Sequence, residues 1–74
     1  MLKISIVTAT GVLLDGEAQR AVELPSVQGR MQVLEGHAPL LAALQQGSVW
    51  VDDKEYPIAG GIARVENDCI KVIC

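Results

Sequence analysis

Aromatic residues are nearly absent from this chain: Trp50 and Tyr56 are the only two among 74 residues, and there is no phenylalanine. A core must therefore be built mainly from Val, Ile, Leu and Ala, because hydrophobic residues still make up 50% of the chain. Charged residues account for only 20%. A composition this hydrophobic and this weakly charged excludes an intrinsically disordered chain. The sequence predicts a folded protein with a thin aliphatic core.

Cysteines and long hydrophobic runs are also scarce. The two cysteines, Cys69 and Cys74, are too few for a disulfide scaffold, which carries a denser and paired set. No apolar run approaches the roughly 20 residues that a membrane-spanning helix needs. The opening residues 1–8 do not resemble a signal peptide, because polar residues interrupt them. We therefore expect no direct membrane insertion and a reducing compartment, the cytosol or its organellar equivalent.

Positive charge is sparse and scattered. Six Lys and Arg residues oppose nine Asp and Glu residues, which gives a net charge of −3. The six cations stand singly along the chain, whereas nucleic-acid-binding proteins usually carry a basic stripe. The charge pattern argues against nucleic acid as a partner, and against direct binding to an anionic membrane for the same reason.

The length of 74 residues fits one small domain and no more. A chain of this size buries only about 60% of the surface that its unfolded form exposes. That leaves no room for a large enzyme with a deep, closed active site. Because the chain contains no internal repeat, linker or low-complexity run, we expect one compact domain over residues 1–74.

Branched side chains point to β-structure. Val, Ile and Thr total 17 residues, and branched Cβ atoms fit a pleated strand better than a helix. Apolar and polar residues alternate, and turn signals recur every eight or so residues, roughly the spacing of an all-β sandwich or barrel. Expected strands cover residues 2–6, 12–14, 22–24, 31–34, 48–51, 56–59, 62–65 and 70–72. Expected turns or loops lie at 10–11, 15–16, 25–29, 52–55, 60–61 and 66–68.

Individual residues refine this pattern. Val49 and Val51 are expected to share one face of their strand, while Trp50 takes the other. Pro57 has no backbone N–H and therefore predicts an edge strand. Cys69 is interpreted as a small hydrophobic residue on the last strand.

The stretch 38–46 is ambiguous. Pro39 suits the first position of a helix, and Leu40, Leu41 and Leu44 have helical spacing. The same residues also suit an irregular strand. Local sequence favours neither alternative.

Candidate chemical groups are few. His37 is the only histidine, and it could take part in catalysis or metal binding only if folding brought Cys69 or Cys74 to it. Their spacing does not match a standard zinc motif. The acidic residues within 52–55 are expected in a solvated turn, because a calcium loop requires glycine and a defined ligand series. We predict no catalytic residue, no metal and no cofactor, and a function in binding another protein. A small hydrolase or metal protein that uses His37 is the alternative.

A distinctive run, Val-Leu-Glu-Gly-His-Ala-Pro-Leu-Leu, occupies residues 33–41. Shorter motifs lie at 6–11 (IVTATG), 15–18 (DGEA), 22–25 (VELP), 44–47 (LQQG), 60–65 (GGIARV) and 67–73 (NDCIKVI). In order and spacing these segments resemble the N-terminal domain of the epsilon subunit of rotary ATP synthases, the counterpart of the mitochondrial delta subunit. The nine-residue run is the most specific part, since it is similar to that family's V-L-P-G-H-A-P-L-L.

The resemblance implies a flattened β-sandwich of two roughly five-stranded sheets. It also favours an extended segment after His37 over a helix. Gly36 permits a turn with an unusual φ at that point. Leu40 and Leu41 then point to opposite faces of a strand, and we expect Leu41 in the core.

The chain departs from the family pattern at several positions. Ala9 and Glu35 replace two prolines, and Ser26 and Gln32 replace two glycines. The C-terminal helical hairpin that the family commonly carries is absent after Cys74, so we interpret the chain as either a short form or a fragment. The hairpin's inhibition of hydrolysis and its ATP binding are therefore not carried over.

The resemblance implies a non-catalytic subunit of the central stalk, or rotor, that couples ion translocation to ATP synthesis or hydrolysis. It implies gamma-subunit binding through Thr8, His37, Ala38 and Ala42, and contact with the c-subunit ring through the loop Ser26–Gln32. The location is peripheral, at the cytoplasmic face of the cell membrane or its matrix or stromal equivalent. The alternative is a generic β-sandwich interaction module with another protein partner. The ring-facing residues are Gln28, Gly29, Arg30, Met31 and Gln32.

Overall fold

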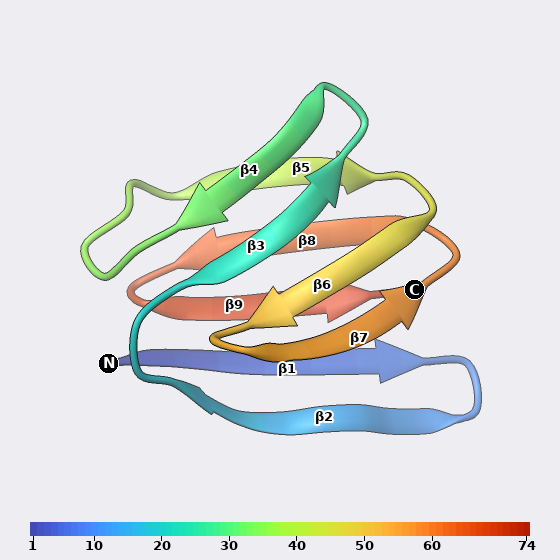
Figure 1. Ribbon diagram of the computed structural model, residues 1–74, viewed down its shortest axis with the longest axis horizontal. Coiled ribbons are helices and arrows are strands. Elements are labelled where there is room, and N and C mark those ends of the chain that lie inside the picture. The colour runs from blue at the N-terminus through green and yellow to red at the C-terminus, as the bar shows by residue number, and fades with distance from the viewer.

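The computed structural model describes residues 1–74 as nine β-strands without a helix (Figure 1). The expected all-β class is confirmed. Within the ambiguous stretch 38–46, Leu40–Leu44 form a strand, so the extended alternative is confirmed and the helical one is wrong. The strands are β1 (Leu2–Thr8), β2 (Gly11–Ala18), β3 (Val22–Ser26), β4 (Gly29–Val33), β5 (Leu40–Leu44), β6 (Gly47–Val51), β7 (Lys54–Ile58), β8 (Gly61–Glu66) and β9 (Cys69–Ile73).

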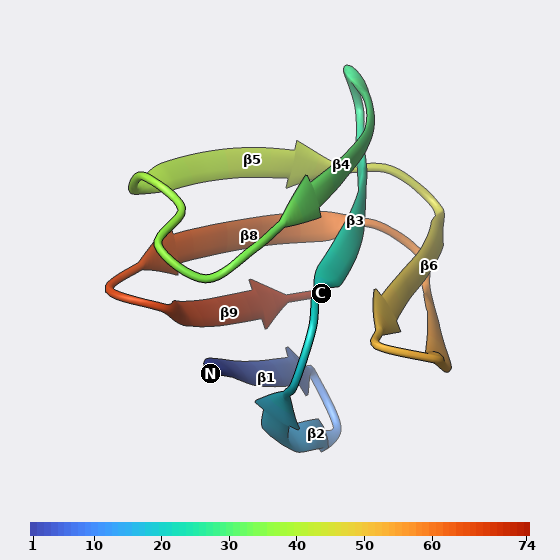
Figure 2. The same ribbon diagram turned by 60° about the vertical axis from the view of Figure 1, so that its left-hand side comes forward.

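The nine strands form one sheet that curls over itself into two layers. Strands β2, β1, β9, β8 and β5 lie side by side in one layer, while β4, β3, β6 and β7 lie across them in the other (Figures 1 and 2). A single residue pair, Ser26 with Leu44, joins β3 to β5 between the layers. The expected sandwich is present, with five strands in one layer and four in the other.

The first and last strands are neighbours in the five-stranded layer. β1 pairs with β2 in antiparallel fashion on one side and with β9 in parallel on the other. The Lys3 N–H donates to the Asp68 carbonyl and the Cys74 N–H to the Val7 carbonyl, each at 2.9 Å, at the two ends of the parallel ladder. Because β9 also pairs with β8, it is the strand that ties β1 and β2 to the rest of the sheet.

Every strand contributes to one core between the layers. Its 15 buried residues form a single cluster that contains no aromatic side chain, so the thin aliphatic core is confirmed. Val49 and Val51 share one face of β6 and Trp50 takes the other, as predicted, and the face of the two valines is the buried one. The cluster consists of Leu2, Ile4, Ile6, Ala18, Val22, Leu24, Val33, Leu44, Val49, Val51, Ile58, Ala63, Val65, Ile70 and Val72.

The expectation that Leu41 lies in the core is wrong. Leu41 is 72% exposed, while Leu40 and Ala42 pack partly against the core and Leu44 is buried within it. Side chains alternate along a strand, so the burial of Leu44 assigns the even-numbered residues of β5 to the inward face. Leu41 consequently projects outward, and Leu40 is the leucine of the pair that contributes to packing.

The first reversal of the chain lies at Ala9-Thr10, and the prediction of a turn at Asp15-Gly16 is wrong. β1 and β2 pair along their length, and Asp15-Gly16 lies inside that ladder. The Thr8 hydroxyl organises the true turn, since it donates to the Gly11 carbonyl at 3.1 Å and accepts from the Thr10 N–H at 3.3 Å. A ladder this long outweighs the local turn preference of one dipeptide.

The segment Ser26–Gln32 is a β-hairpin, in which the strand expected at 31–34 begins earlier and the loop expected at 25–29 is shorter than predicted. β3 continues through Ser26 and β4 begins at Gly29, which leaves only Val27 and Gln28 in the turn. The Ser26 hydroxyl accepts the Gln28 N–H at 3.1 Å, and Gly29 has a φ of 125° that glycine tolerates. Because two residues suffice to close a hairpin, the rest of the segment is free to pair as strands.

Other expectations concern turns, an edge strand and Cys69. Gly36 has a φ of 82°, which confirms the unusual φ expected there. The expected turn between β8 and β9 is also confirmed, and Asn67 and Asp68 form it with φ values of 51° and 61°. β7, which contains Pro57, ends the strand order and is an edge strand as predicted. Cys69 lies on the last strand, β9, as expected, and its side chain is exposed because Ile70 takes the inward position.

Candidate interaction site

The groups considered for chemistry are spread over the fold. His37 lies in the loop before β5, where its Nδ1 is 2.7 Å from the carbonyl oxygen of Ala38. Cys69 begins β9 and Cys74 follows its last residue, and both are free thiols. No three His, Cys, Asp or Glu side chains are arranged to hold a metal ion. None of the elements is a helix that could cross a membrane.

The four residues expected to contact the gamma subunit are spread across the five-stranded layer. Thr8 ends β1, whereas His37 and Ala38 precede β5. The strand register aligns the start of β5 with Ile4, four residues before Thr8 and three strands away. At about 3.3 Å per residue and about 4.8 Å between strands, Thr8 and the start of β5 are roughly 20 Å apart, and His37 lies further still. Ala42 lies between them on β5, so a partner that touches all four must span the layer.

The residues expected to face the c ring lie on the β3–β4 hairpin. Gln28 is in the turn, Arg30 and Gln32 are exposed on β4, and Met31 packs inward against the core. Arg30 Nε lies 2.5 Å from Oε1 of Glu23 on the neighbouring strand. The charge of Arg30 therefore already has a partner within the chain, although an exposed pair of this kind contributes only about 0–1 kcal/mol to stability.

One groove brings residues of both predicted sets together. It lies between β5 and the tip of the β3–β4 hairpin and has a volume of about 300 Å³. Ala42 lines it from β5, and Gln28 and Met31 line it from the hairpin. No charged side chain borders the groove, which suits it to an uncharged, apolar partner. The lining residues are Ser26, Val27, Gln28, Met31, Leu40, Leu41, Ala42 and Ala43.

Sequence reasoning did not identify four hydrophobic residues, Val27, Leu40, Leu41 and Ala43, as members of one surface. Val27 was expected in a loop, and the β5 residues lay in a stretch whose secondary structure the sequence did not decide. Neither expectation indicated that these residues share a surface. Their proximity depends on the approach of β5 to the hairpin, which begins at the pair Ser26–Leu44. The exposure of Val27, 56%, is the structural sign that this part of the hairpin is not packed within the chain.

The outward face of the five-stranded layer carries an apolar row. The register aligns one apolar residue from each of its five strands. Val12, Ile62 and Ile73 in this row are each more than half exposed. Sequence reasoning missed the row because its members come from five separate segments and meet only through the register. In strand order the row is Val12, Val7, Ile73, Ile62 and Ala43.

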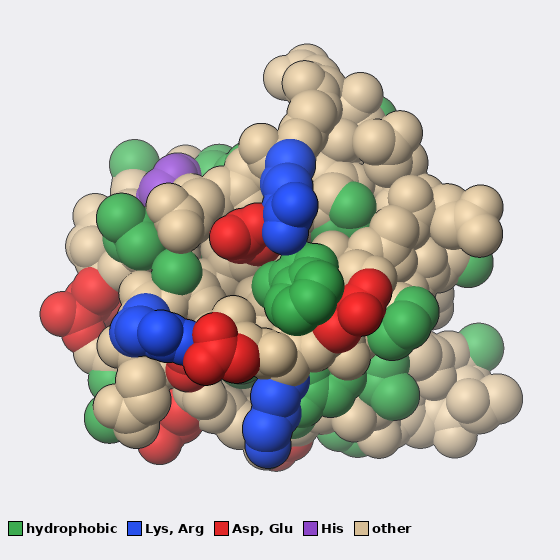
Figure 3. Space-filling model, viewed as in Figure 1, with side chains coloured by type: hydrophobic (Ala, Val, Ile, Leu, Met, Phe, Trp, Pro, Cys, Tyr) green, Lys and Arg blue, Asp and Glu red, His purple; other side chains and the backbone are tan.

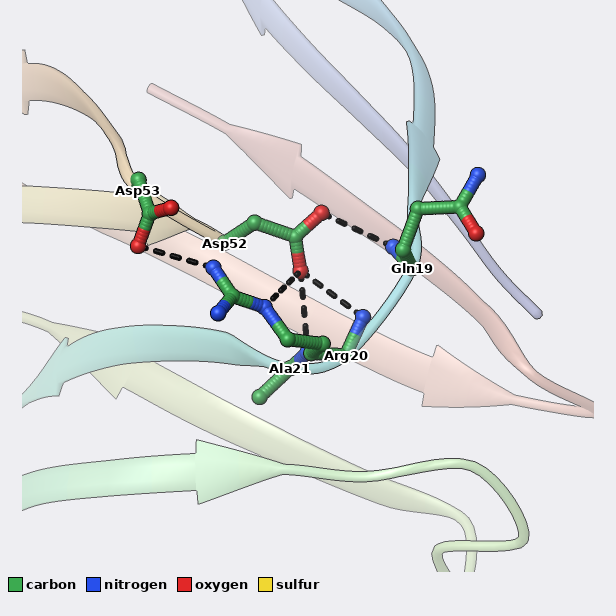
Figure 4. A network of polar contacts seen from close by, with 5 residues as sticks. All are labelled: Gln19, Arg20, Ala21, Asp52 and Asp53. Carbon is green, nitrogen blue, oxygen red and sulfur yellow. Dashed lines mark hydrogen bonds and ion pairs between the residues drawn. The ribbon is translucent and has the colours of Figure 1, made fainter.

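Asp52 lies in the β6–β7 turn, as expected, and its partly exposed carboxylate also connects the two layers. Its carboxylate accepts the backbone N–H groups of Gln19 and Arg20 at 2.8 Å each and of Ala21 at 3.2 Å (Figure 4). Those donors lie on the crossing from β2 to β3. The N–H groups of Gln19 and then Arg20 are the main reasons that the pKa of Asp52 is lowered. Arg20 in turn pairs with Asp53 at 2.8 Å, a bond that raises the pKa of Arg20.

The outward face of the four-stranded layer mixes hydrophobic and charged side chains of both signs (Figure 3). The register sets Trp50 between Glu23 on β3 and Glu55 on β7. Each carboxylate has a partner in the chain, since Glu23 pairs with Arg30 and Glu55 accepts the Ser48 hydroxyl. The two carboxylates of this face are therefore already paired within the chain, whereas the hydrophobic side chains that line the groove beside β5 remain open to a partner.

Comparisons with known proteins agree with one another. Residues 1–74 match the family model described as ATP synthase, delta/epsilon chain, β-sandwich domain. The chain is 40% identical over 76 positions to the ATP synthase epsilon chain of Gloeothece citriformis (strain PCC 7424), a match that covers 97% of this chain and 54% of that one. It is 41% identical to the chloroplastic epsilon chain of Porphyra purpurea, covering 97% and 56%. The chain thus spans about half the length of these curated relatives.

Two solved structures contain chains of similar fold. One is the central stalk and c ring of the mitochondrial ATP synthase of Tetrahymena thermophila, with a TM-score of 0.78, 11% identity, and coverage of 97% of this chain and 61% of that one. The other is the mitochondrial ATP synthase of Euglena gracilis, with a TM-score of 0.81, 24% identity, and coverage of 97% and 49%. At these identities the likeness concerns the fold alone.

Proposed function

Because the chain belongs to the ATP synthase delta/epsilon family, whose β-sandwich domain it matches over residues 1–74, we propose that it is a non-catalytic central-stalk subunit of a rotary ATP synthase. In this role it binds the gamma subunit and the c-subunit ring, and it couples ion translocation to ATP synthesis or hydrolysis. It works as a peripheral component at the cytoplasmic face of the membrane, or at the matrix or stromal equivalent. The observation that carries the proposal is the match of the family model to the whole sandwich.

A rotor subunit transmits torque, and the fold suits that task. Its two layers share one close-packed aliphatic core, and packed interiors transmit strain instead of absorbing it. The connection through Asp52 adds a polar link between the crossing after β2 and the β6–β7 turn. Both features make the domain stiff, as the transmission of torque requires.

We assign the gamma contact to Thr8, His37, Ala38 and Ala42. The small side chains of the two alanines allow a partner to approach the backbone closely. The His37 ring contacts the carbonyl of its own neighbour, so it contributes shape to the loop more than a hydrogen bond to the partner. The uncharged groove beside Ala42 supplies apolar surface for the same contact.

We assign the c-ring contact to the β3–β4 hairpin, from Gln28 to Gln32. Its exposed positions are polar, as a surface facing the polar loops of a ring requires. Arg30 uses its Nε toward Glu23, and a guanidinium carries further N–H donors that can reach a ring carboxylate or carbonyl.

Gamma binding is tested with the substitution Ala42→Glu. A carboxylate beside an uncharged groove is left unpaired when the partner covers it, so affinity for purified gamma should fall by about tenfold or more. The matched control Ala42→Ser, which is small and uncharged, should bind nearly as well as the parent. Titration calorimetry measures both, and the urea midpoint of each isolated variant shows that the domain still folds. If Ala42→Glu bound gamma with the affinity of the parent, Ala42 would not lie in the interface.

The c-ring contact is tested by cross-linking in the assembled rotor. The variant Arg30→Cys should form a disulfide with cysteines placed in the c-subunit loops. The control Lys71→Cys, on the outward face of the other layer, should not. Cross-links from position 30 only to gamma, or none in an intact rotor, would contradict the orientation of the hairpin.

A further inference from the structure

Half of one edge of β5 is open. β5 pairs with β8 along its whole length, but on its other side it meets β3 only near Leu44. On that side the Ala43 carbonyl accepts the Val27 N–H at 2.9 Å, and the hairpin then turns away. Backbone groups alternate in direction along an antiparallel strand. The N–H and C=O of Leu41 therefore point to the same side as the Ala43 carbonyl, where no strand of the chain pairs with them. Figure 2 shows β5 at the end of its layer.

The other open edges of the sheet carry features that discourage strand addition, and β5 carries none. β7 contains Pro57, which cannot donate a ladder bond, and it begins with Lys54. β2 has an extra residue, Leu13, that breaks its register with β1, and β4 carries the charged Arg30 near its start. β5 reads Leu-Leu-Ala-Ala-Leu, with no charge, proline or bulge. Natural proteins normally cover or block an apolar edge of this kind.

The groove described above runs beside this open edge. Val27 and Met31 form one wall and Ala42 belongs to the other. An added strand would present successive side chains to opposite faces of the layer. One set would enter the groove over Ala42, and the other would lie on the outward face beside Leu41, which is 72% exposed. Because no charged side chain lines the groove, the segment that fits it is itself uncharged and apolar.

We propose that the open edge of β5 receives an extended, uncharged apolar segment of the gamma subunit as an additional strand. The identity of the partner rests on the proposed function, whereas the strand form rests on the unpaired backbone of Leu41. Main-chain hydrogen bonds supply the attachment and the groove selects the side chains, as in other cases of strand addition. A helix does not fit this edge, because its own backbone groups bond internally and leave Leu41 without a partner.

Backbone hydrogen exchange, measured by NMR on the isolated chain and on its complex with purified gamma, tests the proposal without altering the protein. In the free chain the Leu41 amide should exchange on the order of 100-fold faster than those of Leu40 and Ala42, which face β8. On binding, exchange at Leu41 should slow by about 100-fold, because its N–H gains an acceptor. The amides of Leu40 and Ala42 should change much less.

Two substitutions at one position separate the backbone from the side chain. Leu41→Pro removes the N–H that faces the open edge, and edge strands tolerate proline. Leu41→Ala keeps the N–H and removes the exposed side chain. Affinity for gamma should fall by tenfold or more in Leu41→Pro relative to Leu41→Ala. The fluorescence of Trp50, the only tryptophan, reports whether each variant is folded. If Leu41→Pro does not fold, the hydrogen-exchange experiment on the parent chain tests the proposal instead.

The outcomes distinguish this inference from the proposed function. Failure of the parent chain to bind gamma overturns both. Parental binding with unchanged exchange at Leu41, or equal affinities of two folded variants, overturns strand addition and leaves the central-stalk role standing. Protection of Leu41 that rises with the concentration of the isolated chain would identify a second copy of this chain as the occupant, and would overturn the assignment to gamma.

Discussion

Leucines of this chain differ in what their removal costs, because the sheet points them in different directions. Leu24 is fully buried, whereas Leu41 is 72% exposed. We expect Leu24→Ala to lower the free energy of unfolding by about 2–5 kcal/mol, since it leaves a cavity in a thin core. Leu41→Ala should change it by no more than about 0.5 kcal/mol. Urea unfolding followed by Trp50 fluorescence measures both values, and a large loss for Leu41→Ala would contradict its outward orientation.

Asp52 makes stability depend on pH. The backbone N–H groups of Gln19 and Arg20 lower its pKa in the folded state, so the folded chain binds this proton less readily than the unfolded chain. Its contribution is therefore complete above the ordinary aspartate pKa of about 4. It is lost as the pH falls through the lowered folded-state value. The urea midpoint of the parent should decrease below about pH 4, and Asp52→Asn should flatten that decrease.

A neighbouring aspartate provides the control for this prediction. Asp53 is 88% exposed and has an ion pair with Arg20 but no bond to the crossing backbone. Asp53→Asn should keep the acid dependence of the parent. Asparagine tolerates the φ of 55° found at position 52, so Asp52→Asn keeps the local backbone. If Asp52→Asn lost stability in acid as steeply as the parent, the carboxylate would not be the titrating group.

Among the elements, β8 and β9 approach so closely at one end that only glycine fits. Gly61 begins β8 with a φ of 143°, and a Cβ atom there would collide with the carbonyl oxygen of Ile73. Gly61→Ala should lower the free energy of unfolding by about 2–3 kcal/mol or more, because neither backbone can yield easily. At Gly29, with a φ of 125°, nothing lies within 4 Å of such an atom. Gly29→Ala should cost only about 1–2 kcal/mol of backbone strain. Equal losses in urea melts would show that the β8–β9 approach is not tight.

The groove likewise depends on how two elements of the fold, β5 and the β3–β4 hairpin, lie relative to each other. β3 meets β5 at Ser26 and then reverses through Val27 and Gln28 into β4. The short turn carries the hairpin away from β5, which leaves both the free backbone of Leu41 and the space beside Ala42. A longer contact between β3 and β5 would close that space and satisfy the edge within the chain.

For the whole molecule, β9 holds the five-stranded layer together. It lies between β1 and β8, and it is the only connection in the sheet between the β1–β2 pair and the remaining strands. A chain that ends at Asp68 should therefore lose cooperative unfolding and the dispersed NMR spectrum of a folded domain. A chain that ends at Ile73, which lacks only the Cys74 hydrogen bond to Val7, should keep both. A dispersed spectrum from the shorter chain would show that the layers fold without β9.

Sequence alone determined the class of the protein and much of its outline. The alternation of apolar residues predicted strands where β1, β3, β6 and β8 form. The turn signals at Gly36 and Asn67–Asp68 predicted the turns correctly, because a turn depends on adjacent residues. The run at residues 33–41 identified the family. These features are local, since period-two burial and positive φ depend on a few neighbouring residues.

Tertiary structure decided which face each strand turns inward and which distant residues meet. The parity of β5 placed Leu41 outside, and the register of β2 absorbed Asp15-Gly16 into a strand. Asp52 found its backbone donors more than 30 residues away in sequence, and the groove formed from β5 and the β3–β4 hairpin. Local periodicity carries no information about the register between segments, and shifting a strand by one residue reverses every side chain. The core, the open edge and the surfaces for partners therefore became defined only when the strands were paired.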